Sequence, residues 1–524
     1  MHRRLFTSAA LAAALAAAPF AADAAVIRYV PQADPGVLDP VMNQSYVSQQ
    51  AAYMVYDTLV SLDANMVAQP QMLERHSVSA DGLVYTFTLR PGLKFTDGSP
   101  VKAADAVASL KRWAARDTNG RKMVELGMDV AATDDRTFTL RLREKWGLVL
   151  DSLAKIAGSA LFVMREKDAN TPVTSAVPEI VGSGPFKFVR ADYVPASTLA
   201  YEKNPDYVPR TEPASYYAGG KRALVDRVEW KIIPDPATAL AALAAGEVDI
   251  YETPPLDLLP TLKSNPNITV AVHNVAGSMA YMRPNFLHPP FNNVKARQAL
   301  LYLGDQADYM RAAIGSDPLT WQVCWAWLAC GSAYGSEAGA DAYRKWDPAK
   351  AKALFAEAGY KGEKIVVMQP TDQPILKSVT EVAVQRMKEI GLNVDAQNMN
   401  WGTLVGRRGK QEAPDQGGWN MFFTWTYGLD LASPVTNSAL ATTCDKKNYA
   451  GWPCDEEIER LKDAWGKAPT LDERKQIATR IQERAAEFVP YAPVGQYSAP
   501  LAYRSNLKGF LKVPLPVMWN VEKP

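Results

Sequence analysis

The sequence has little of what catalytic and metal sites are built from. Four histidines occur among 524 residues: His2, His76, His273 and His288. There is no H-E-x-x-H segment, Cys/His metal spacing, P-loop or G-x-G-x-x-G segment, and Val181 occupies the place of the first glycine in a G-x-S-x-G element. We therefore expect a protein that is not an enzyme and has no cofactor or metal centre. A secreted hydrolase is the alternative, because acid and base residues far apart in the chain leave no local motif.

A strong charge of one sign is also absent. The chain has 57 Lys+Arg against 56 Asp+Glu. Proteins that bind nucleic acid or anionic membranes usually carry a basic surface excess. The composition therefore predicts no nucleic-acid partner.

Long apolar runs are missing except near the start of the chain. There the basic segment MHRR precedes the apolar run LFTSAALAAALAAAPF, which is shorter than a typical membrane span. Ala22-Asp23-Ala24 then fits the small-residue pattern at which signal peptides are cleaved. The pattern predicts a signal peptide over 1–24 and a soluble, periplasmic mature chain. A buried N-terminal helix is the alternative.

Cysteine is scarce, and its spacing is not that of a redox or zinc motif. The four cysteines are Cys324, Cys330, Cys444 and Cys454. In an oxidising compartment two local disulfides, 324–330 and 444–454, are the simplest arrangement. Other pairings and unpaired buried thiols are the alternatives.

The chain is too long for one hydrophobic core, and its patterns alternate between strand and helix. A single core stops growing near about 250–300 residues, so at least two lobes are expected. The segment 225–251 illustrates the local pattern. An alternating strand is followed by Asp235 as N-cap, Pro236 at the first helical position, Gly246 as helix stop and a second strand. Such β-α-β units predict an α/β fold.

Several motifs occur in an order that resembles one protein family. They are LERHSVSADGLVYTFTLRPGLKFTDGSPVKAADAVASL, IVGSGPFKF, IIPDPATALAALAAGEVDI, NNVKARQALLYL and DPAKAKALFAEAGY. The series is similar to family 5 extracellular solute-binding proteins, the dipeptide-, oligopeptide- and nickel-binding proteins of ABC importers. The resemblance covers the whole chain after the signal peptide.

The resemblance implies the two-lobe periplasmic-binding-protein fold of class II, in its large peptide-binding subtype with a hinge and an extra subdomain. Lobe I is expected at 25–275, with the inserted subdomain at about 56–184. Lobe II is expected at 276–485, and 486–524 is expected to return to lobe I. In this family the lobes close on the ligand.

The function implied is that of a monomeric periplasmic substrate-binding component, which passes a small ligand to an ABC permease in the inner membrane. A short peptide is the family's usual ligand, and a metal chelate, glutathione or an opine is the alternative. The few histidines argue against a nickel ion held directly by the protein.

The clearest binding candidate is Asp430. In peptide-binding members of the family, an Asp four residues before a Pro pairs with the ligand's α-ammonium group. Asp430 precedes Pro434 by four positions and follows Trp425. A loop-capping role for Asp430 is the alternative. In a strand, Trp425 and Tyr427 would share one face near its C-terminal end, where ligands bind in α/β sheets, so both are candidates for the cleft wall.

Two further segments supply candidates through the same resemblance. Trp401 matches a strand-to-helix junction of the family, and Arg407 and Arg408 follow it; an arginine there would suit a ligand carboxylate. Core packing for Trp401 and solvated surface positions for the arginines are the alternatives. Tyr281 lies where the family has a tyrosine beside the ligand, with core packing as the alternative. Arg283 departs from the family pattern and is expected in an interlobe salt bridge or at an anionic ligand.

Overall fold

The computed structural model describes residues 24–524, apart from 157–158, 275, 318–319, 372, 447 and 469. Nearly all of the predicted signal peptide lies outside the described residues. Within the described ranges, no helix has both the length and the apolar character needed to cross a membrane.

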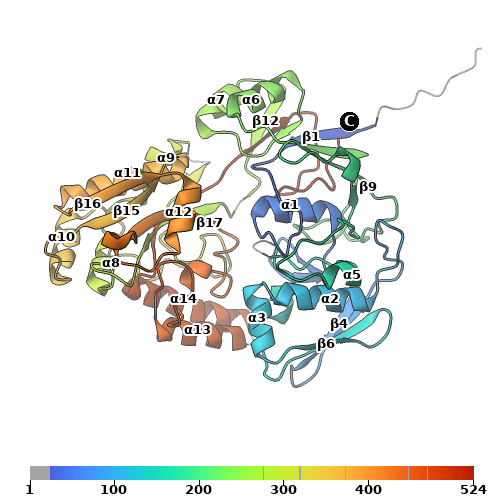
Figure 1. Ribbon diagram of the computed structural model, residues 1–524, viewed down its shortest axis with the longest axis horizontal. Helices are drawn as coiled ribbons and strands as arrows, with labels where there is room; N and C mark the ends of the chain where they lie inside the picture. The colour runs from blue at the N-terminus through green and yellow to red at the C-terminus, as the bar shows by residue number, and fades with distance from the viewer. Residues whose placement is uncertain are drawn as a thin grey trace, which may run out of the picture.

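Two mixed sheets lie in two lobes, seen on the right and left of Figure 1. The sheet of lobe I runs, in spatial order, β12 (Ile268–Ala271), β19 (Leu501–Arg504), β11 (Ile250–Tyr251), β1 (Val26–Val30), β10 (Arg227–Lys231), β9 (Thr198–Lys203) and β8 (Phe186–Phe188). The sheet of lobe II runs β14 (Trp321–Gln322), β18 (Ala492–Tyr497), β13 (Ser278–Pro284), β17 (Met421–Tyr427), β15 (Ile365–Pro370) and β16 (Val394–Met399).

The predicted β-α-β unit is confirmed in lobe I. Helix α6 (Pro236–Ala245) begins where the Asp235 carboxylate accepts the Thr238 N–H at 2.8 Å, and it ends at Gly246, whose φ is +78°. The two strands that flank α6, β10 and β11, both pair in parallel with β1. The carboxyl ends of β1 and β11 therefore meet at one edge of the sheet.

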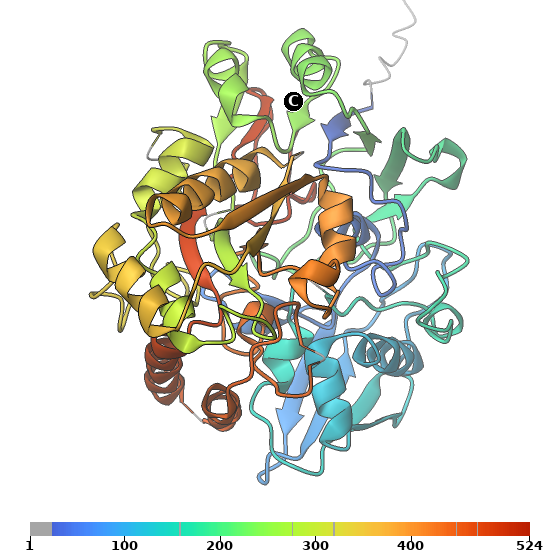
Figure 2. The same cartoon turned by 60° about the vertical axis from the view of Figure 1, so that its left-hand side comes forward.

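Helices cover the sheets of both lobes. In lobe I they are α1 (Tyr46–Val55), α2 (Ala103–Ala114), α3 (Thr118–Glu125), α4 (Val149–Leu153), α5 (Glu166–Ala169), α6 and α7 (Leu259–Lys263). In lobe II they are α8 (Val294–Leu300), α9 (Gln306–Ile314), α10 (Pro348–Glu357), α11 (Pro374–Glu389), α12 (Trp401–Arg408), α13 (Glu456–Lys467) and α14 (Leu471–Phe488). Figure 2, in which lobe II comes forward, shows its orange helices against the strands of the sheet.

Within lobe I, a separate antiparallel sheet packs with α2, and α3 packs on α2. Its strands run β4 (Leu73–Val78), β5 (Val84–Leu89), β7 (Thr137–Arg141) and β6 (Asp129–Ala132), and a short pair, β2 (Val60–Leu62) and β3 (Ala68–Pro70), lies beside it.

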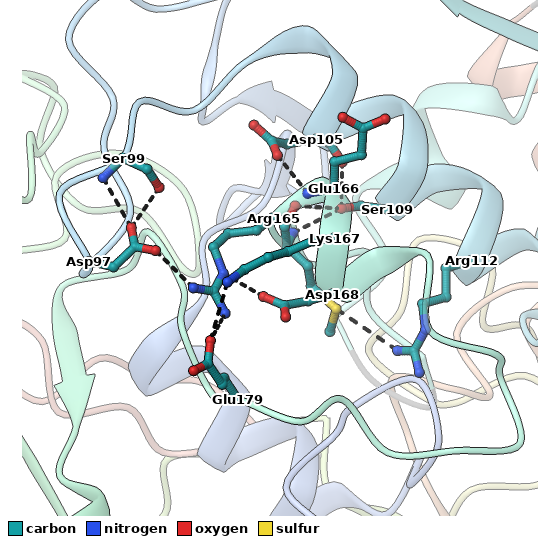
Figure 3. A network of polar contacts seen from close by, with 11 residues as sticks. Asp97, Ser99, Asp105, Ser109, Arg112, Arg165, Glu166, Lys167, Asp168 and Glu179 are labelled. Carbon is teal, nitrogen blue, oxygen red and sulfur yellow. Dashed lines mark hydrogen bonds and ion pairs between the residues drawn. The ribbon is translucent and has the colours of Figure 1, made fainter.

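Arg165, just before α5, binds three carboxylates in this part of lobe I (Figure 3). Its nitrogens lie 2.8 Å from Asp97, 2.5 Å from Asp168 and 2.6 Å from Glu179. The Arg165 side chain is almost buried, so this network fixes the loops that carry Asp97 and Glu179.

The C-terminal segment is shared between the lobes, which corrects the predicted return to lobe I at 486. β18 pairs antiparallel with β13 in lobe II, and only β19 reaches lobe I, where it pairs with β11 and β12. The chain therefore crosses back near 498–500. The expected boundary lies too early in the chain because the Pro- and aromatic-rich tail contains two short strands, and a short strand's pattern does not identify its partner.

The lobes also meet far from the two crossings, at the foot of Figure 1, where α3 lies beside α13. The Gly147 N–H donates to the Gly466 carbonyl at 3.1 Å. Lys122 lies 3.8 Å from Asp463, and Arg474 lies 3.7 Å from Asp151. These contacts hold the two lobes together in this conformation.

Both predicted disulfides, Cys324–Cys330 and Cys444–Cys454, are confirmed, and no cysteine is free. Replacing Cys444 and Cys454 together with serine should lower the free energy of unfolding by about 2–3 kcal/mol, because the bridge closes a local loop in the unfolded chain. Non-reducing denaturant titration measures this loss. The pair Cys324→Ser and Cys330→Ser, which opens a shorter loop, is the matched comparison and should cost slightly less. An unchanged midpoint in both variants would contradict a stabilising role.

Candidate functional site

A tyrosine of lobe I and an aspartate of lobe II meet where the two lobes face each other. Tyr46 is the first residue of α1, and its hydroxyl donates a hydrogen bond to an Asp430 carboxylate oxygen. The Tyr46 ring centroid lies 3.8 Å from that of Tyr427 and 6.3 Å from that of Trp425. Three of the predicted site residues are thus brought together with one from the opposite lobe.

The position of Asp430 follows from the strand before it. β17 is buried from Met421 to Thr424 and becomes partly exposed from Trp425 onward. The chain then turns, with the Asp430 N–H bonded to the Tyr427 carbonyl at 3.0 Å. The first part of β17 therefore belongs to the core of lobe II, and its last three residues reach the candidate site. Asp430 lies just past the carboxyl end of the strand.

The charge environment of Asp430 favours a cationic partner. Burial between the lobes raises the pKa of Asp430, while Lys155 and the Tyr46 hydroxyl oppose that rise and Asp117 adds to it. Lys155 is itself engaged, with its Nζ 2.8 Å from Asp117. Since a desolvated carboxylate is costly to ionise without a nearby cation, a ligand that brings one is stabilised here.

A second carboxylate, Glu252, lies close by at the end of β11. It is 6% exposed, and it accepts the Gln32 N–H at 2.7 Å and a hydrogen bond from the Tyr29 hydroxyl. Burial raises the pKa of Glu252 to about 7. Burial raises the pKa of Tyr427, and the charges of Glu252 and Asp430 both raise it further, so Tyr427 lies near both acids.

Tyr281 lies in the core of lobe II, contrary to the prediction of a ligand contact. It is 1% exposed, its hydroxyl is 3.0 Å from that of Thr426, and its ring centroid is 4.7 Å from that of Tyr491. The cause is the central position of β13, which is paired on both edges and buried along its whole length.

Both roles predicted for Arg283 are wrong, since the side chain is buried in lobe II and forms no salt bridge with the described residues of lobe I. The side chain is 0% exposed, and its nitrogens donate to four backbone carbonyls, those of Ala439, Tyr449, Ala450 and Pro490, at 2.7–3.1 Å. The guanidinium also lies over the Tyr449 ring. Arg283 therefore joins three segments of lobe II from the inside.

Arg407 and Arg408 brace the start of β17 and lie away from Asp430. Arg407 donates to the Gln397 side chain at 2.6 Å and to the carbonyls of Gly417 and Gly418. Arg408 lies over the Tyr449 ring and donates to its hydroxyl at 3.1 Å.

β17 separates the two arginines from Asp430. Seven residues of strand span roughly 23 Å. Trp401 is partly buried against the lobe II clusters at the first residue of α12. The structure therefore does not bring Arg407 or Arg408 together with Asp430. Trp401 follows the carboxyl end of β16, which lies at the same edge of the sheet as the carboxyl end of β17, so its role beside the ligand stays a prediction.

Three residues of the site were not found from the sequence: Tyr46, Lys155 and Glu252. Each belongs to a segment far from Asp430 in the chain, and Tyr46 precedes it by 384 positions. No local pattern marks such a residue. The only signal was that Glu252 directly follows a strand at the carboxyl edge of a parallel pair.

The site offers two carboxylates, three aromatic rings and one lysine. In the described parts of the chain, no group of three or more His, Cys, Asp or Glu side chains could hold a metal ion. An arrangement of this kind can bind a cation and stack apolar or planar groups.

Known proteins share the chain's sequence patterns and architecture. The model of the bacterial extracellular solute-binding proteins, family 5 Middle, matches residues 67–449. A probable peptide ABC transporter periplasmic-binding protein of Sinorhizobium fredii is 42% identical over 496 residues, which are 93% of this chain and 91% of the relative. The glutathione-binding protein of Salmonella typhi is 27% identical over 492 residues, 91% of this chain and 90% of the relative. The structure of a dipeptide-binding protein from Pseudoalteromonas sp. SM9913 in complex with Met-Leu matches with a TM-score of 0.78 at 20% identity, over 95% of this chain and 100% of that chain.

Proposed function

The chain belongs to the family 5 bacterial extracellular solute-binding proteins, and on that basis we propose that it captures short peptides between its two lobes for an ABC importer. The observation that carries this proposal is the position of Asp430. It faces the opposite lobe, beside Trp425 and Tyr427, and contacts Tyr46. A peptide's α-ammonium group placed there would pair with the carboxylate, while the rings enclose the first side chain.

The two lobes would close on the ligand by bending at the two places where the chain crosses between them. The chain passes between the sheets of the two lobes after β12 ends at Ala271 and again after β18 ends at Tyr497, and we propose these two connections as the hinge. A peptide held by Asp430 on one lobe and by α1 on the other would favour the closed conformation, because it would contact both lobes only when they meet. In this proposal lobe I comprises 25–271 and 501–524, and lobe II comprises 278–497.

Export and delivery complete the proposal. The N-terminal signal would direct a monomer to the periplasm, where the closed, loaded form would dock on the permease in the inner membrane. The site's acids and rings need no reaction step, so no catalysis is part of this function.

The proposal is tested by identifying what the protein carries. The full chain is purified from a periplasmic extract without denaturation and analysed by native mass spectrometry, and ligand-free protein is then screened by thermal shift. Retained di- to tetrapeptides, and a rise in Tm with peptides alone, are expected. Binding confined to metal chelates or opines would overturn the peptide assignment, and steady conversion of a substrate would overturn the binding function.

Tyr46→Phe should weaken peptide binding roughly tenfold. The substitution keeps the ring beside Tyr427 but removes the hydroxyl that bonds Asp430 across the lobe boundary, and a hydrogen bond to a charged group contributes about 1.5 kcal/mol. Isothermal titration with a dipeptide measures the loss.

The matched control for this variant is Tyr360→Phe, which removes a hydroxyl bonded within lobe II, to the Glu363 carbonyl. It should leave the affinity unchanged. Equal affinity of Tyr46→Phe and wild type would show that the Tyr46 hydroxyl plays no part in the closed state.

A further inference from the structure

Glu252 is a buried acid whose position the α-ammonium site does not explain. Asp430 alone would suffice to pair one ammonium group. Glu252 nevertheless lies in lobe I, near Tyr427, whose pKa both acids raise. Its carboxylate has two donors, the Gln32 N–H and the Tyr29 hydroxyl, although an ionised carboxylate can accept about four hydrogen bonds.

An independent observation at the same place points to a missing donor. Gln50 is 0% exposed, and its Nε2 donates to the Tyr29 hydroxyl and to the Pro516 carbonyl. Its Oε1, on the same amide carbon, has no hydrogen-bond partner. Buried polar atoms without partners are rare in proteins because each costs free energy.

Helix α1 links this place to Asp430. Gln50 follows Tyr46 by four residues, so both side chains leave the same face of the helix. Tyr46 contacts Asp430, and Gln50 contacts the Tyr29 hydroxyl that lies against Glu252. One face of α1 therefore runs from the first acid to a second group of polar atoms, which includes the unpartnered Gln50 Oε1.

Resting on the proposed function, we propose that Glu252 and Gln50 form a second cation subsite and that the protein selects peptides with a lysine or arginine side chain near their amino end. The α-ammonium group pairs with Asp430, and the basic side chain passes Tyr427 and pairs with Glu252. Its remaining N–H groups reach the Gln50 carbonyl oxygen. Glu252 and the Gln50 Oε1 offer acceptors to a side chain with several donors, and the Gln32 Nε2, beside the backbone N–H that bonds Glu252, is an unpartnered donor at the same place.

The test compares two dipeptides that differ in one charge. Lys-Ala and norleucine-Ala have the same α-ammonium group and similar side-chain length, but only the first carries a second cation. Ligand-free wild-type protein should bind Lys-Ala at least tenfold more tightly at about pH 8, by isothermal titration. Glu252→Gln should abolish that difference, because it should weaken the binding of Lys-Ala at least tenfold more than the binding of norleucine-Ala.

A control variant and a pH series separate this role from a structural one. Glu202→Gln, which removes a carboxylate of the same sheet paired with Lys187, should keep the preference. The preference of wild type should fall as the pH is lowered through about 7, where Glu252 becomes protonated. Tyr29 and Tyr427 are the titratable groups beside it, and burial raises the pKa of both, so neither changes charge in that range.

The outcomes are distinct. Wild type binding both dipeptides equally, or Glu252→Gln retaining the preference, would overturn the second subsite while leaving the peptide function intact. Failure of both dipeptides to bind would overturn the proposed function and the second subsite with it.

Discussion

Asp430→Asn should weaken the binding of a short peptide at least about 100-fold. The substitution keeps the size of the side chain but removes its charge. An ammonium group enclosed beside Trp425 and Tyr427 would then be left without a counter-ion, and losing one partner of an enclosed ion pair costs about 3 kcal/mol or more. Isothermal titration of wild type and variant with one dipeptide measures the ratio.

The same variant should not be less stable without ligand. Burial raises the pKa of Asp430, so at neutral pH the folded protein carries the carboxylate at a cost, and that cost grows as the pH rises above the unfolded value. Removing the charge relieves it. The Tm of ligand-free Asp430→Asn should therefore equal or exceed that of wild type at about pH 7.

Asp472→Asn, an exposed position on α14, is the matched control and should bind like wild type. An Asp430→Asn protein that binds the dipeptide as tightly as wild type would exclude the ammonium role. A variant with a strongly reduced Tm would instead assign Asp430 to the stability of the fold.

Arg283→Met should lower the free energy of unfolding by about 3–5 kcal/mol. Methionine fits the buried space but has no donors, so the carbonyls of residues 439, 449, 450 and 490 would lose their shared partner in the interior of lobe II. Denaturant titration followed by circular dichroism gives the change. Arg283→Lys should also destabilise, because an ammonium cannot present the planar set of donors that four carbonyls need.

Arg311→Met is the comparison for Arg283. Arg311 lies on α9 with a side chain more than half exposed, so its loss should change stability by less than about 0.5 kcal/mol. If Arg283→Met were as stable as wild type but bound peptides poorly, the ligand role first considered for Arg283 would be restored and the structural role excluded.

The strand that carries the candidate site could be predicted from its local pattern. In β17 the alternation places Trp425 and Tyr427 at the carboxyl end, and the family resemblance, through the spacing from Asp430 to Pro434, added Asp430. The β-α-β unit around α6 was equally visible, since Asp235, Pro236 and Gly246 each have a local reason for their positions.

The roles of the β13 residues could not be predicted from the sequence. The alternation in β13 places Tyr281 and Arg283 on the opposite face from the residues next to them in the chain. The strand is central, however, and helices or loops cover both of its faces. A pattern of alternation cannot tell a cleft from a second covered face. An arginine that donates to backbone carbonyls cannot be recognised from the sequence either, because every residue has a carbonyl.

Contacts between the lobes were beyond the reach of local patterns. Tyr46 and Glu252 meet Tyr427 and Asp430 only after two sheets have formed and the lobes have come together. β18 likewise joins lobe II by pairing with β13, more than 200 positions earlier. These features depend on long-range topology rather than on propensity or spacing.

The measurement that tests the peptide-binding claim most directly is an equilibrium titration of ligand-free wild-type protein with Ala-Ala and with N-acetyl-Ala-Ala. The two ligands differ in the α-ammonium group that Asp430 is proposed to pair. We expect saturable one-to-one binding of Ala-Ala and an affinity at least about 100-fold weaker for the acetylated form. Equal affinities, or no binding of either peptide, would contradict the account.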